Sequence, residues 1–334
     1  MGGGGEIAGE DGSLADLGEW GLIAALKARM PAGALTSVGI GDDSAVVAAP
    51  SGSVVVAVDL LIEGRHFRRD WSSAYDIGVK AAARSLADIA AMGAVNTALL
   101  VALAASGTLP ARWATELAEG LALEATRAGA GVVGGDTARA DTVTLSVTAL
   151  GDLENRRPVL RSGARPGDVI AVAGPLGHAA AGLALLMAGV IPVPPALSSL
   201  VAAQVRPAPP YDAGPEAARL GATAMIDISD GLLADLGHVA AASGVQINVN
   251  SSRLAPGTAL REAAASLPTS SENLAAIAQE WVLTGGEDHS LAAAFPPDTM
   301  LPARWRMIGE VLPGEGVTVD GAPHAGPGGW QHFR

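Results

Sequence analysis

Four short segments of the chain place carboxylates directly beside glycines. Glycine allows a tight turn and lets a bulky ligand approach the backbone, and carboxylate oxygens suit hard cations such as Mg²⁺, which in turn hold phosphates. The sequence has no Gly-Lys-Ser/Thr loop of the Walker type. Any bound nucleotide is therefore predicted to be held through metal-bridged aspartates. The four segments are Gly39-Ile40-Gly41-Asp42-Asp43, Gly134-Gly135-Asp136-Thr137, Asp227-Ile228-Ser229-Asp230-Gly231 and Gly285-Gly286-Glu287-Asp288.

The composition indicates a globular protein with a core of small aliphatic side chains. Hydrophobic residues make up 49% of the 334 residues but aromatic residues only 3%, so Ala, Val, Leu and Ile must fill the core. That length allows two domains. The formal net charge of −13 argues against nucleic acids and anionic membranes as partners. Phosphorylated substrates could still bind if divalent cations lie between the like charges.

Cysteine is absent, which excludes disulfides, thiolate nucleophiles and cysteine-ligated zinc or iron–sulfur sites. No apolar run approaches the ~18 residues of a membrane-spanning helix. The glycine-rich start has neither the basic nor the apolar segment of a secretory signal. We therefore expect a cytoplasmic protein in which residues 1–12 form a flexible tail.

Strand and helix patterns mix without strict alternation, which predicts an α/β or α+β chain of two domains, residues 13–150 and 151–334. The proline-dense residues 191–215 are expected to be irregular. The expected strands cover residues 54–59, 97–104, 132–133, 142–150, 168–173, 224–228, 246–249, 281–284, 291–295 and 307–311. The expected helices cover residues 13–30, 73–92, 110–129, 177–189 and 232–242.

The candidate residues also have ordinary structural interpretations. Gly and Asp form solvated turns for backbone reasons alone, Asp59 could be a surface carboxylate at a strand end, and His66 could be a packing or capping residue. Lys80, Arg84 and Asp88 share one face of a helix, as a surface ion-pair network would. That helix is otherwise apolar nearly all round, so buried charges on it would need partners, which a metal with phosphates could supply.

The sequence lacks the motifs of several other kinds of active site. The segment Gly174-Pro175-Leu176-Gly177 lacks the Gly-x-Gly-x-x-Gly pattern and the acidic ribose ligand of a dinucleotide fold. No Gly-x-Ser-x-Gly elbow of a serine hydrolase is present. The six histidines show no zinc-ligand spacing. Metal-bridged aspartates therefore remain the favoured interpretation.

Further segments complete an ordered set that runs from residue 39 to residue 333. Besides the four above they are Glu63-Gly64-Arg65-His66-Phe67, Leu86-Ala87-Asp88-Ile89-Ala90-Ala91-Met92-Gly93-Ala94, Arg161-Ser162-Gly163-Ala164-Arg165-Pro166-Gly167-Asp168 and Gly329-Trp330-Gln331-His332-Phe333. In this order the set resembles the thiamine-monophosphate kinase family, within the superfamily of aminoimidazole-ribonucleotide synthetase-like ATP-binding enzymes. The motifs are specific as a set.

The resemblance implies ATP-dependent phosphorylation of thiamine phosphate to thiamine diphosphate, by direct in-line attack and without a catalytic side chain. It implies several Mg²⁺ ions, ATP as co-substrate, and a homodimer whose N-terminal mixed sheets pair across the two-fold axis, each followed by a C-terminal α/β domain. The implied Mg²⁺ ligands are Asp43, Asp59, Asp88, Asp136, Asp227 and Asp230. The implied contacts are Gly135, Asp136, Arg161 and Ser229 for ATP, and His66, Glu287 and Trp330 for thiamine phosphate.

The chain departs from the family pattern at two places. Ala57-Val58 stand where the family usually has Ser-Thr before the strand-end aspartate, which removes one hydroxyl ligand to a metal. His289-Ser290 follow the last motif, where Tyr-Glu is common. Two alternatives stay open, another ATP-dependent ligase or synthetase of the superfamily acting on a phosphorylated small molecule, and a non-catalytic nucleotide-binding relative. All six implied metal carboxylates are nevertheless present.

Overall fold

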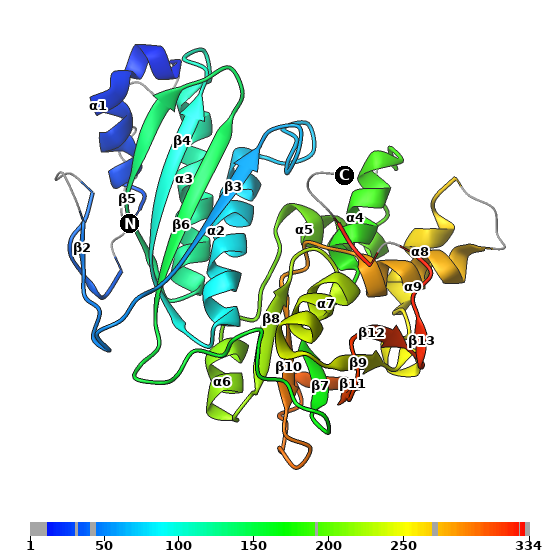
Figure 1. Ribbon diagram of the computed structural model, residues 1–334. Helices are drawn as coiled ribbons and strands as arrows, with labels where there is room; N and C mark the ends of the chain where they lie inside the picture. Colours follow the sequence, from blue (N-terminus) through cyan, green and yellow to red (C-terminus); the bar gives the residue numbers. More distant parts are fainter. Residues whose placement is uncertain are drawn as a thin grey trace. The chain divides into compact units, whose positions relative to one another are not determined.

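The computed structural model describes residues 12–30, 33–40, 45–190, 193–268, 273–326 and 328–330. The chain divides into two compact units (Figure 1). The N-terminal unit comprises Met1–Ile89 and Asn96–Glu154, and the C-terminal unit comprises Ala90–Val95 and Asn155–Arg334. The expected tail lies outside the described residues except for Gly12, and Asp43 lies outside them as well.

A four-stranded sheet with the strand order β3-β6-β4-β5 forms the centre of the N-terminal unit. Its outer pair β3·β6 is antiparallel and its pair β4·β5 is parallel. Figure 1 shows α2 and α3 along one face of this sheet. The elements of the unit are α1 (Leu14–Lys27), β1 (Thr36–Val38), β2 (Val46–Val47), β3 (Val55–Ile62), α2 (Ala74–Ala91), β4 (Val95–Ala105), α3 (Ala111–Arg127), β5 (Gly131–Arg139) and β6 (Thr144–Asp152).

Two helices of this unit begin where the sequence provides a capping box. The Ser13 hydroxyl accepts the N–H of Asp16, whose carboxylate accepts the N–H of Ser13. Ser73 and Asp76 repeat the arrangement before α2. These reciprocal bonds satisfy N–H groups that a helix start leaves without partners. The prediction of a buried, charged α2 is confirmed, because Lys80 is only 2% exposed.

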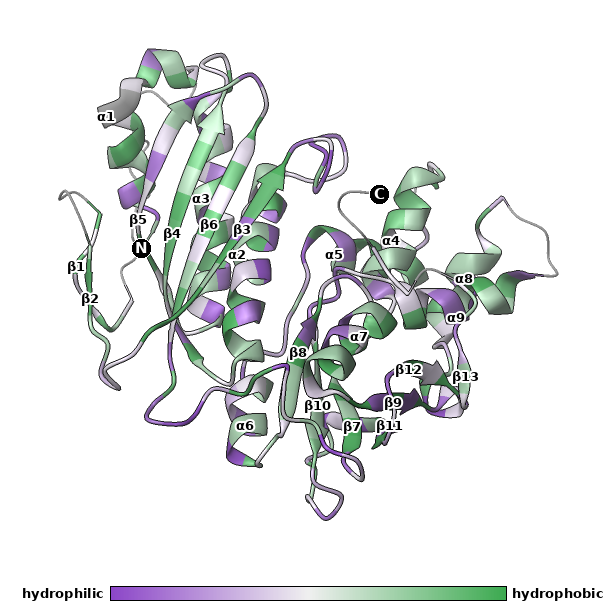
Figure 2. Ribbon diagram, viewed as in Figure 1, coloured by the Kyte–Doolittle hydropathy of each residue, from purple (hydrophilic) through white to green (hydrophobic). Residues whose placement is uncertain are grey.

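The edge strand β3 has one apolar face that the unit leaves open. Val56, Val58 and Leu60 alternate along it and are 60%, 66% and 49% exposed, whereas Leu61 on the other face is fully buried. Figure 2 shows the apolar character of this strand in green. Exposed apolar side chains on a sheet edge mark an interaction surface when they form one stripe. We call Val54, Val56, Val58 and Leu60 the β3 stripe.

A seven-stranded sheet with the order β13-β12-β9-β11-β7-β10-β8 forms the C-terminal unit. The described pairs are antiparallel except β12·β9, which is parallel. Its elements are β7 (Val169–Ala173), α4 (His178–Met187), η1 (Pro195–Leu197), α5 (Ser198–Val205), α6 (Ala213–Arg219), β8 (Ala224–Ile228), α7 (Leu232–Ser243), β9 (Gln246–Val249), η2 (Ser251–Leu254), α8 (Thr258–Ala265), α9 (Leu274–Thr284), β10 (Ser290–Phe295), β11 (Trp305–Leu312), β12 (Gly316–Val319) and β13 (Ala322–Pro323).

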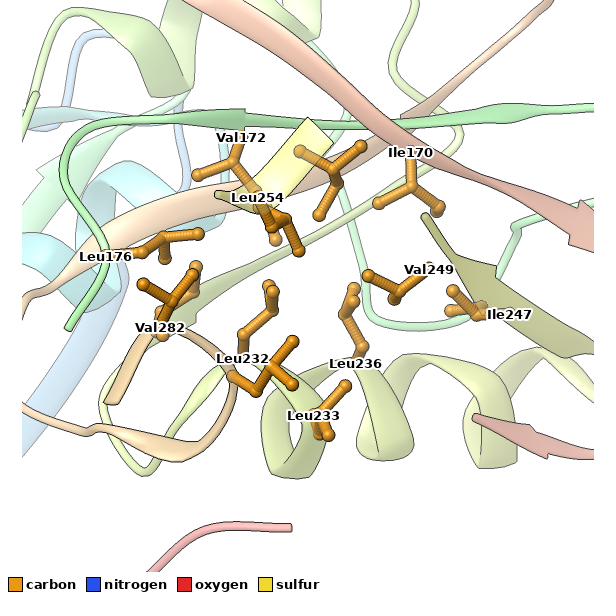
Figure 3. Close-up of a cluster of buried hydrophobic side chains, with 14 of the residues drawn as sticks. Ile170, Val172, Leu176, Leu232, Leu233, Leu236, Ile247, Val249, Leu254 and Val282 are labelled. Atoms are coloured by element: carbon orange, nitrogen blue, oxygen red, sulfur yellow. The ribbon is translucent and has the colours of Figure 1, made fainter. Parts of the chain in front are cut away.

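The core of the C-terminal unit lies between this sheet and its helices. Figure 3 shows side chains of β7, including Ile170 and Val172, facing Leu232 and Leu236 of α7, with Val282 of α9 beside them. All five side chains are at most 4% exposed. Burial on this scale stabilises the unit by about 1.5–3 kcal/mol for each large aliphatic side chain. This packing holds the carboxyl end of β8 in a fixed place at the start of α7.

Three local predictions are wrong. Residues 281–284 form the last turn of α9 and not a strand, because Val282 and Leu283 continue a helical apolar face into the core. Residues 191–215 include the helices η1, α5 and the start of α6, where prolines occupy first-turn positions that need no N–H. The segment Gly134–Thr137 is no turn, since it continues β5 in register with β4.

Candidate active site

The carboxyl end of β8 gathers most of the predicted residues of the C-terminal unit. Asp227 lies within β8, and Ser229 and Asp230 follow it before α7 begins. The N–H of Glu287 donates to the Ser229 carbonyl at 2.8 Å, and the N–H of Trp330 donates to the Asp230 carbonyl at 2.9 Å. Segments more than 50 residues apart in the sequence are thereby fixed around one strand end.

Glycines make this close approach possible. A Cβ atom added to Gly286 would lie 2.4 Å from the Ser229 carbonyl oxygen, and one added to Gly329 would lie 2.4 Å from the Asp230 carbonyl oxygen. Neither contact is sterically allowed, so both positions require glycine. The glycines of the Gly-Gly-Glu-Asp and Gly-Trp segments therefore let these backbones pack against the end of β8.

Asp235 is a functional candidate that the sequence reasoning missed. Its carboxylate accepts the N–H of Asp230 at 3.1 Å and the N–H of Gly231 at 3.0 Å. Burial, followed by the negative charge of Asp227, raises the pKa of Asp235 to about 7. The signal was an aspartate in the first turn of the helix that follows Ser-Asp-Gly. The site thus concentrates carboxylates that a cation would stabilise.

Glu287 is held in a defined orientation. Its Oε2 accepts a hydrogen bond of 2.9 Å from Nε2 of Gln204 on α5, a residue that local sequence patterns did not single out. Glu287 has φ 66°, in the left-handed region that non-glycine residues seldom adopt. Such a conformation persists where surrounding structure enforces it, often at ligand sites. The geometry is therefore compatible with the predicted contact to substrate.

The neighbouring Asp288 has a structural role. It is 3% exposed, and its carboxylate accepts the N–H of Gly177 at 2.5 Å and the N–H of Ala179 at 2.8 Å, which caps α4. Burial raises the pKa of Asp288 to about 7 although these backbone bonds lower it. The second carboxylate of the Gly-Gly-Glu-Asp motif is consequently an anchor for the turn.

In the N-terminal unit, α2 and β3 bring a second set of groups together. The Ser85 hydroxyl donates to Oδ2 of Asp59 at 2.8 Å, and Nη2 of Arg84 lies 3.7 Å from Oδ1 of the same carboxylate. Asp88, half-buried, follows one turn later on α2. The sequence pointed to Arg84 through its helical spacing, but it gave no signal for Ser85.

Asp136 does not join this set within one chain. It lies on β5 and Asp59 lies on β3, at opposite edges of the sheet, three strand spacings or about 14 Å apart. Their side chains also point to opposite faces, because Asp59 is in register with buried Val147 and Asp136 with half-buried Ala102. The adjacent Gly135 is explained by packing, since its Cβ would lie 1.9 Å from the Val101 carbonyl oxygen.

His66 and Arg161 lie in loops. Nδ1 of His66 accepts the N–H of Ile62 at 3.0 Å, so the neutral ring carries its proton on Nε2, where it can serve as a donor.

The loop with Arg161 runs antiparallel to β8, because the N–H of Met225 donates to the Leu160 carbonyl and Gly163 lies beside Thr223. Arg161 therefore lies beside the first half of β8, about 10 Å along the strand from Asp227.

The donor chemistry fits Mg²⁺, which takes oxygen ligands and commonly one or two carboxylates with water and phosphates. Among the residues that the structure describes, no group of three or more His, Cys, Asp or Glu side chains is gathered for a metal. A metal site made of two carboxylates and the oxygens of a phosphorylated ligand would agree both with the oxygen-rich donor set and with the absence of a larger cluster among the described residues. In the described part of the chain, none of the helices has the length and apolarity to cross a bilayer.

Comparison with known proteins decides the family. Residues 41–153 match the model of the AIR synthase related protein N-terminal domain, and residues 165–290 match that of its C-terminal domain. The chain is 46% identical to thiamine-monophosphate kinase of Mycobacterium tuberculosis over 329 residues, which cover 98% of this chain and 95% of the relative. This chain belongs to the thiamine-monophosphate kinase family. The kinase of Corynebacterium glutamicum is 40% identical, covering 96% and 95% of the two chains.

Solved structures of this family share the fold. AaThiL complexed with AMPPCP and TMP has a TM-score of 0.78 at 33% identity and covers 95% of this chain and 98% of its own. Thiamine-monophosphate kinase from Stenotrophomonas maltophilia K279a has a TM-score of 0.77 at 32% identity, with 91% and 95% covered. The predicted fold class, two α/β domains of this superfamily, is confirmed.

Proposed function

We propose that this protein is a thiamine-phosphate kinase that uses ATP to convert thiamine phosphate into thiamine diphosphate. The carrying observation is the carboxyl end of β8, where Ser229 and Asp230 follow Asp227 and accept hydrogen bonds from the N–H groups of Glu287 and Trp330. The family relationship supports the same activity, since AaThiL was complexed with AMPPCP, an ATP analogue, and TMP.

The chemistry requires positioning and charge neutralisation rather than a proton acceptor. A phosphate monoester is ionised near neutral pH and can attack the γ-phosphoryl group directly. The main obstacle is repulsion between two anions. Bound Mg²⁺ would neutralise that charge. The residues of the chain would hold the reacting groups in line and fix their distance.

We assign the metal-holding role to the carboxylates of each unit separately. Asp227 and Asp230 serve in the C-terminal unit, Asp59 and Asp88 serve in the N-terminal unit beside Ser85, and Asp43 and Asp136 complete the set. Burial and the nearby charge of Asp227 both disfavour ionisation of Asp235. A cation bound at the end of β8 would offset this concentration of negative charge, which supports the assignment. For ATP we propose contacts from Gly135, Asp136, Arg161 and Ser229.

For thiamine phosphate we propose contacts from His66, Glu287 and Trp330. The Nε2–H of His66 suits a phosphate oxygen. Glu287, oriented by Gln204, carries the negative charge that a thiazolium cation prefers. Trp330 is 67% exposed and its backbone N–H is bonded to the Asp230 carbonyl; an indole ring is a favourable stacking surface for a cationic heterocycle.

We further propose that the active form is a homodimer whose N-terminal sheets pair through the β3 stripe. Valine and leucine side chains exposed by 48–66% on β3 and at Val54 just before it favour association with a second apolar surface. Asp136 lies on the same face of the sheet as the stripe, so pairing would place it near the partner. The cytoplasm, where ATP is available, is the compartment we propose.

The test is an assay of ADP release by purified protein. We expect turnover only when thiamine phosphate, ATP and Mg²⁺ are present together, with thiamine diphosphate as the product. Asp230→Asn should reduce turnover at least ~10²-fold, because one metal carboxylate is lost. A synthetase of the same superfamily would instead need a different phosphorylated substrate. ATP turnover that is the same without thiamine phosphate would contradict the kinase assignment.

A further inference from the structure

His289 follows the Gly-Gly-Glu-Asp motif and has no role in the assignments above. It is only 2% exposed and adopts φ 51°, in the left-handed region. Its N–H donates to the Ile228 carbonyl at 3.0 Å, which ties the residue to the last position of β8. Two left-handed residues, Glu287 and His289, thus flank the buried anchor Asp288, and the turn presents both side chains from one rigid support.

The imidazole of His289 reaches a carboxylate that we assign to metal binding. Its Nδ1 lies 3.2 Å from Oδ2 of Asp227, and the two side chains are 3% and 5% exposed. An ionised carboxylate only accepts hydrogen bonds, so Nδ1 must carry the hydrogen. A bond between two groups as buried as these lies in a low dielectric, where it is stronger than at the surface.

Burial of the other ring nitrogen, Nε2, makes the placement of His289 unfavourable in free energy. Nε2 of His289 is buried and has no hydrogen-bond partner among the described residues. A buried polar atom without a partner costs about 1–3 kcal/mol. An apolar side chain would fill this space without that cost. Packing alone therefore gives no reason for a histidine, whereas a hydrogen bond to Asp227 does.

We propose that His289 is a positioning residue for Asp227: its Nδ1–H holds Oδ2 and thereby turns the other carboxylate oxygen toward a divalent cation. The proposal rests on the proposed function only for the assignment of a divalent cation to Asp227. Partners that hold a metal ligand in place typically contribute 10–100-fold to metal affinity. His289 would act in this way from outside the ligand set, at a position where tyrosine is common in the family.

Two variants separate the hydrogen bond from packing. In His289→Asn the side-chain amide places an N–H near the position of Nδ1, and asparagine tolerates positive φ. His289→Leu removes the donor and keeps an apolar bulk. We expect Mn²⁺ binding, measured by the electron paramagnetic resonance of free Mn²⁺, to weaken about tenfold in His289→Leu and to stay within about threefold of wild type in His289→Asn. His238→Leu, at an exposed position of α7, is the matched control and should bind normally.

The kinetic pattern should agree. His289→Leu should raise the Mg²⁺ concentration for half-maximal turnover about tenfold while changing the KM for thiamine phosphate less than twofold. Wild-type Mn²⁺ affinity in His289→Leu, or equal losses in both His289 variants, would overturn the proposal.

A measurement on the unmodified protein keeps the test valid if a variant does not fold. Carbon-13 chemical shifts of the imidazole ring distinguish a proton on Nδ1 from one on Nε2, and through-bond correlations from the assigned backbone resonances of residue 289 identify the His289 ring. We expect the Nδ1–H form. A ring protonated on Nε2 alone would refute the inference. Failure of the kinase assay would refute the proposed activity, while the tautomer and the Mn²⁺ affinity would still decide the role of His289.

Discussion

The hydroxyl of Ser85 donates a hydrogen bond of 2.8 Å to Oδ2 of Asp59. Ser85 is fully buried on α2 and Asp59 lies on β3, so the bond fixes the carboxylate against the helix that carries Asp88. The sequence lacks the hydroxyl side chains that usually precede this aspartate in the family, since Ala57-Val58 stand there. A hydroxyl is nevertheless beside Asp59, and it comes from α2.

Ser85→Ala should weaken both stability and metal use. The variant leaves a carboxylate oxygen of Asp59 without its buried donor, and we expect a loss of about 1–2 kcal/mol in the free energy of unfolding. The Mg²⁺ concentration for half-maximal turnover should rise several-fold. Urea unfolding and Mg²⁺ titrations of activity measure the two effects. Ser146→Ala, on the other face of the sheet at β6, is the control, and equal behaviour of both variants would contradict the role of Ser85.

Val58→Lys should disrupt the proposed dimer. Val58 is the most exposed member of the β3 stripe, at 66%, and a buried lysine without a partner is strongly unfavourable at an apolar interface. Light scattering at micromolar concentration should give the dimer mass for wild type and the monomer mass for the variant. Met300→Lys, at a position 90% exposed in the C-terminal unit, should remain dimeric. A monomeric wild type would refute the proposed assembly.

Gly135→Ala should destabilise the N-terminal unit strongly. The added methyl group would lie 1.9 Å from the carbonyl oxygen of Val101, so β5 could not keep its register with β4, and we expect a loss of 3 kcal/mol or more, on the order of a severe core substitution. The control is Gly237→Ala on α7, where an added Cβ meets nothing within 4 Å. This second variant should be neutral or stabilising by about 1 kcal/mol. Thermal unfolding compares the two.

Asp288 should make stability depend on pH. Its pKa of about 7 in the folded state exceeds the ordinary value of 3.8, so the folded state keeps a proton that the unfolded state has lost between these limits. The stabilising contribution of this proton to the free energy of unfolding is complete below pH about 4. It is lost as the pH rises to about 7. Between pH 5 and 7 wild type should lose on the order of 2 kcal/mol relative to Asp288→Asn.

The matched control for this pH series is Asp298→Asn, which replaces an exposed aspartate. Its unfolding free energy should follow the wild-type pH profile. Asp235, whose pKa is also about 7, adds a slope of the same sign that both variants retain. Parallel profiles for wild type and Asp288→Asn would contradict the raised pKa of Asp288. Chemical denaturation at fixed ionic strength provides the data.

Trp330→Ala should impair binding of thiamine phosphate more than binding of ATP. Loss of a stacking surface for a cationic ring costs about 1–2 kcal/mol, or about a tenfold rise in the KM for thiamine phosphate. Trp330→Phe should retain much of the wild-type KM because it keeps an aromatic face. Steady-state kinetics with each substrate varied in turn gives both constants. Equal increases for the two substrates would remove Trp330 from the thiamine side.

Local sequence determined the parts of this protein that depend on neighbouring residues. The capping boxes at Ser13 and Ser73 predicted two helix starts, and the apolar run before Asp227 predicted a strand that ends on carboxylates at the start of a helix. The order of the motifs alone was enough to identify the family. These features are local because hydrogen bonds of caps and the burial period of one strand involve residues only a few positions apart.

Tertiary structure alone decided which groups meet. Strand order separates Asp136 from Asp59, and the register of β5 with β4 explains Gly135 by packing against Val101. The partners of the site carboxylates, Ser85 for Asp59 and His289 for Asp227, lie 26 and 62 residues away in the sequence. Such contacts depend on which faces the sheets bury against their helices, and no local spacing encodes that choice, since it is made by the packing of the whole core.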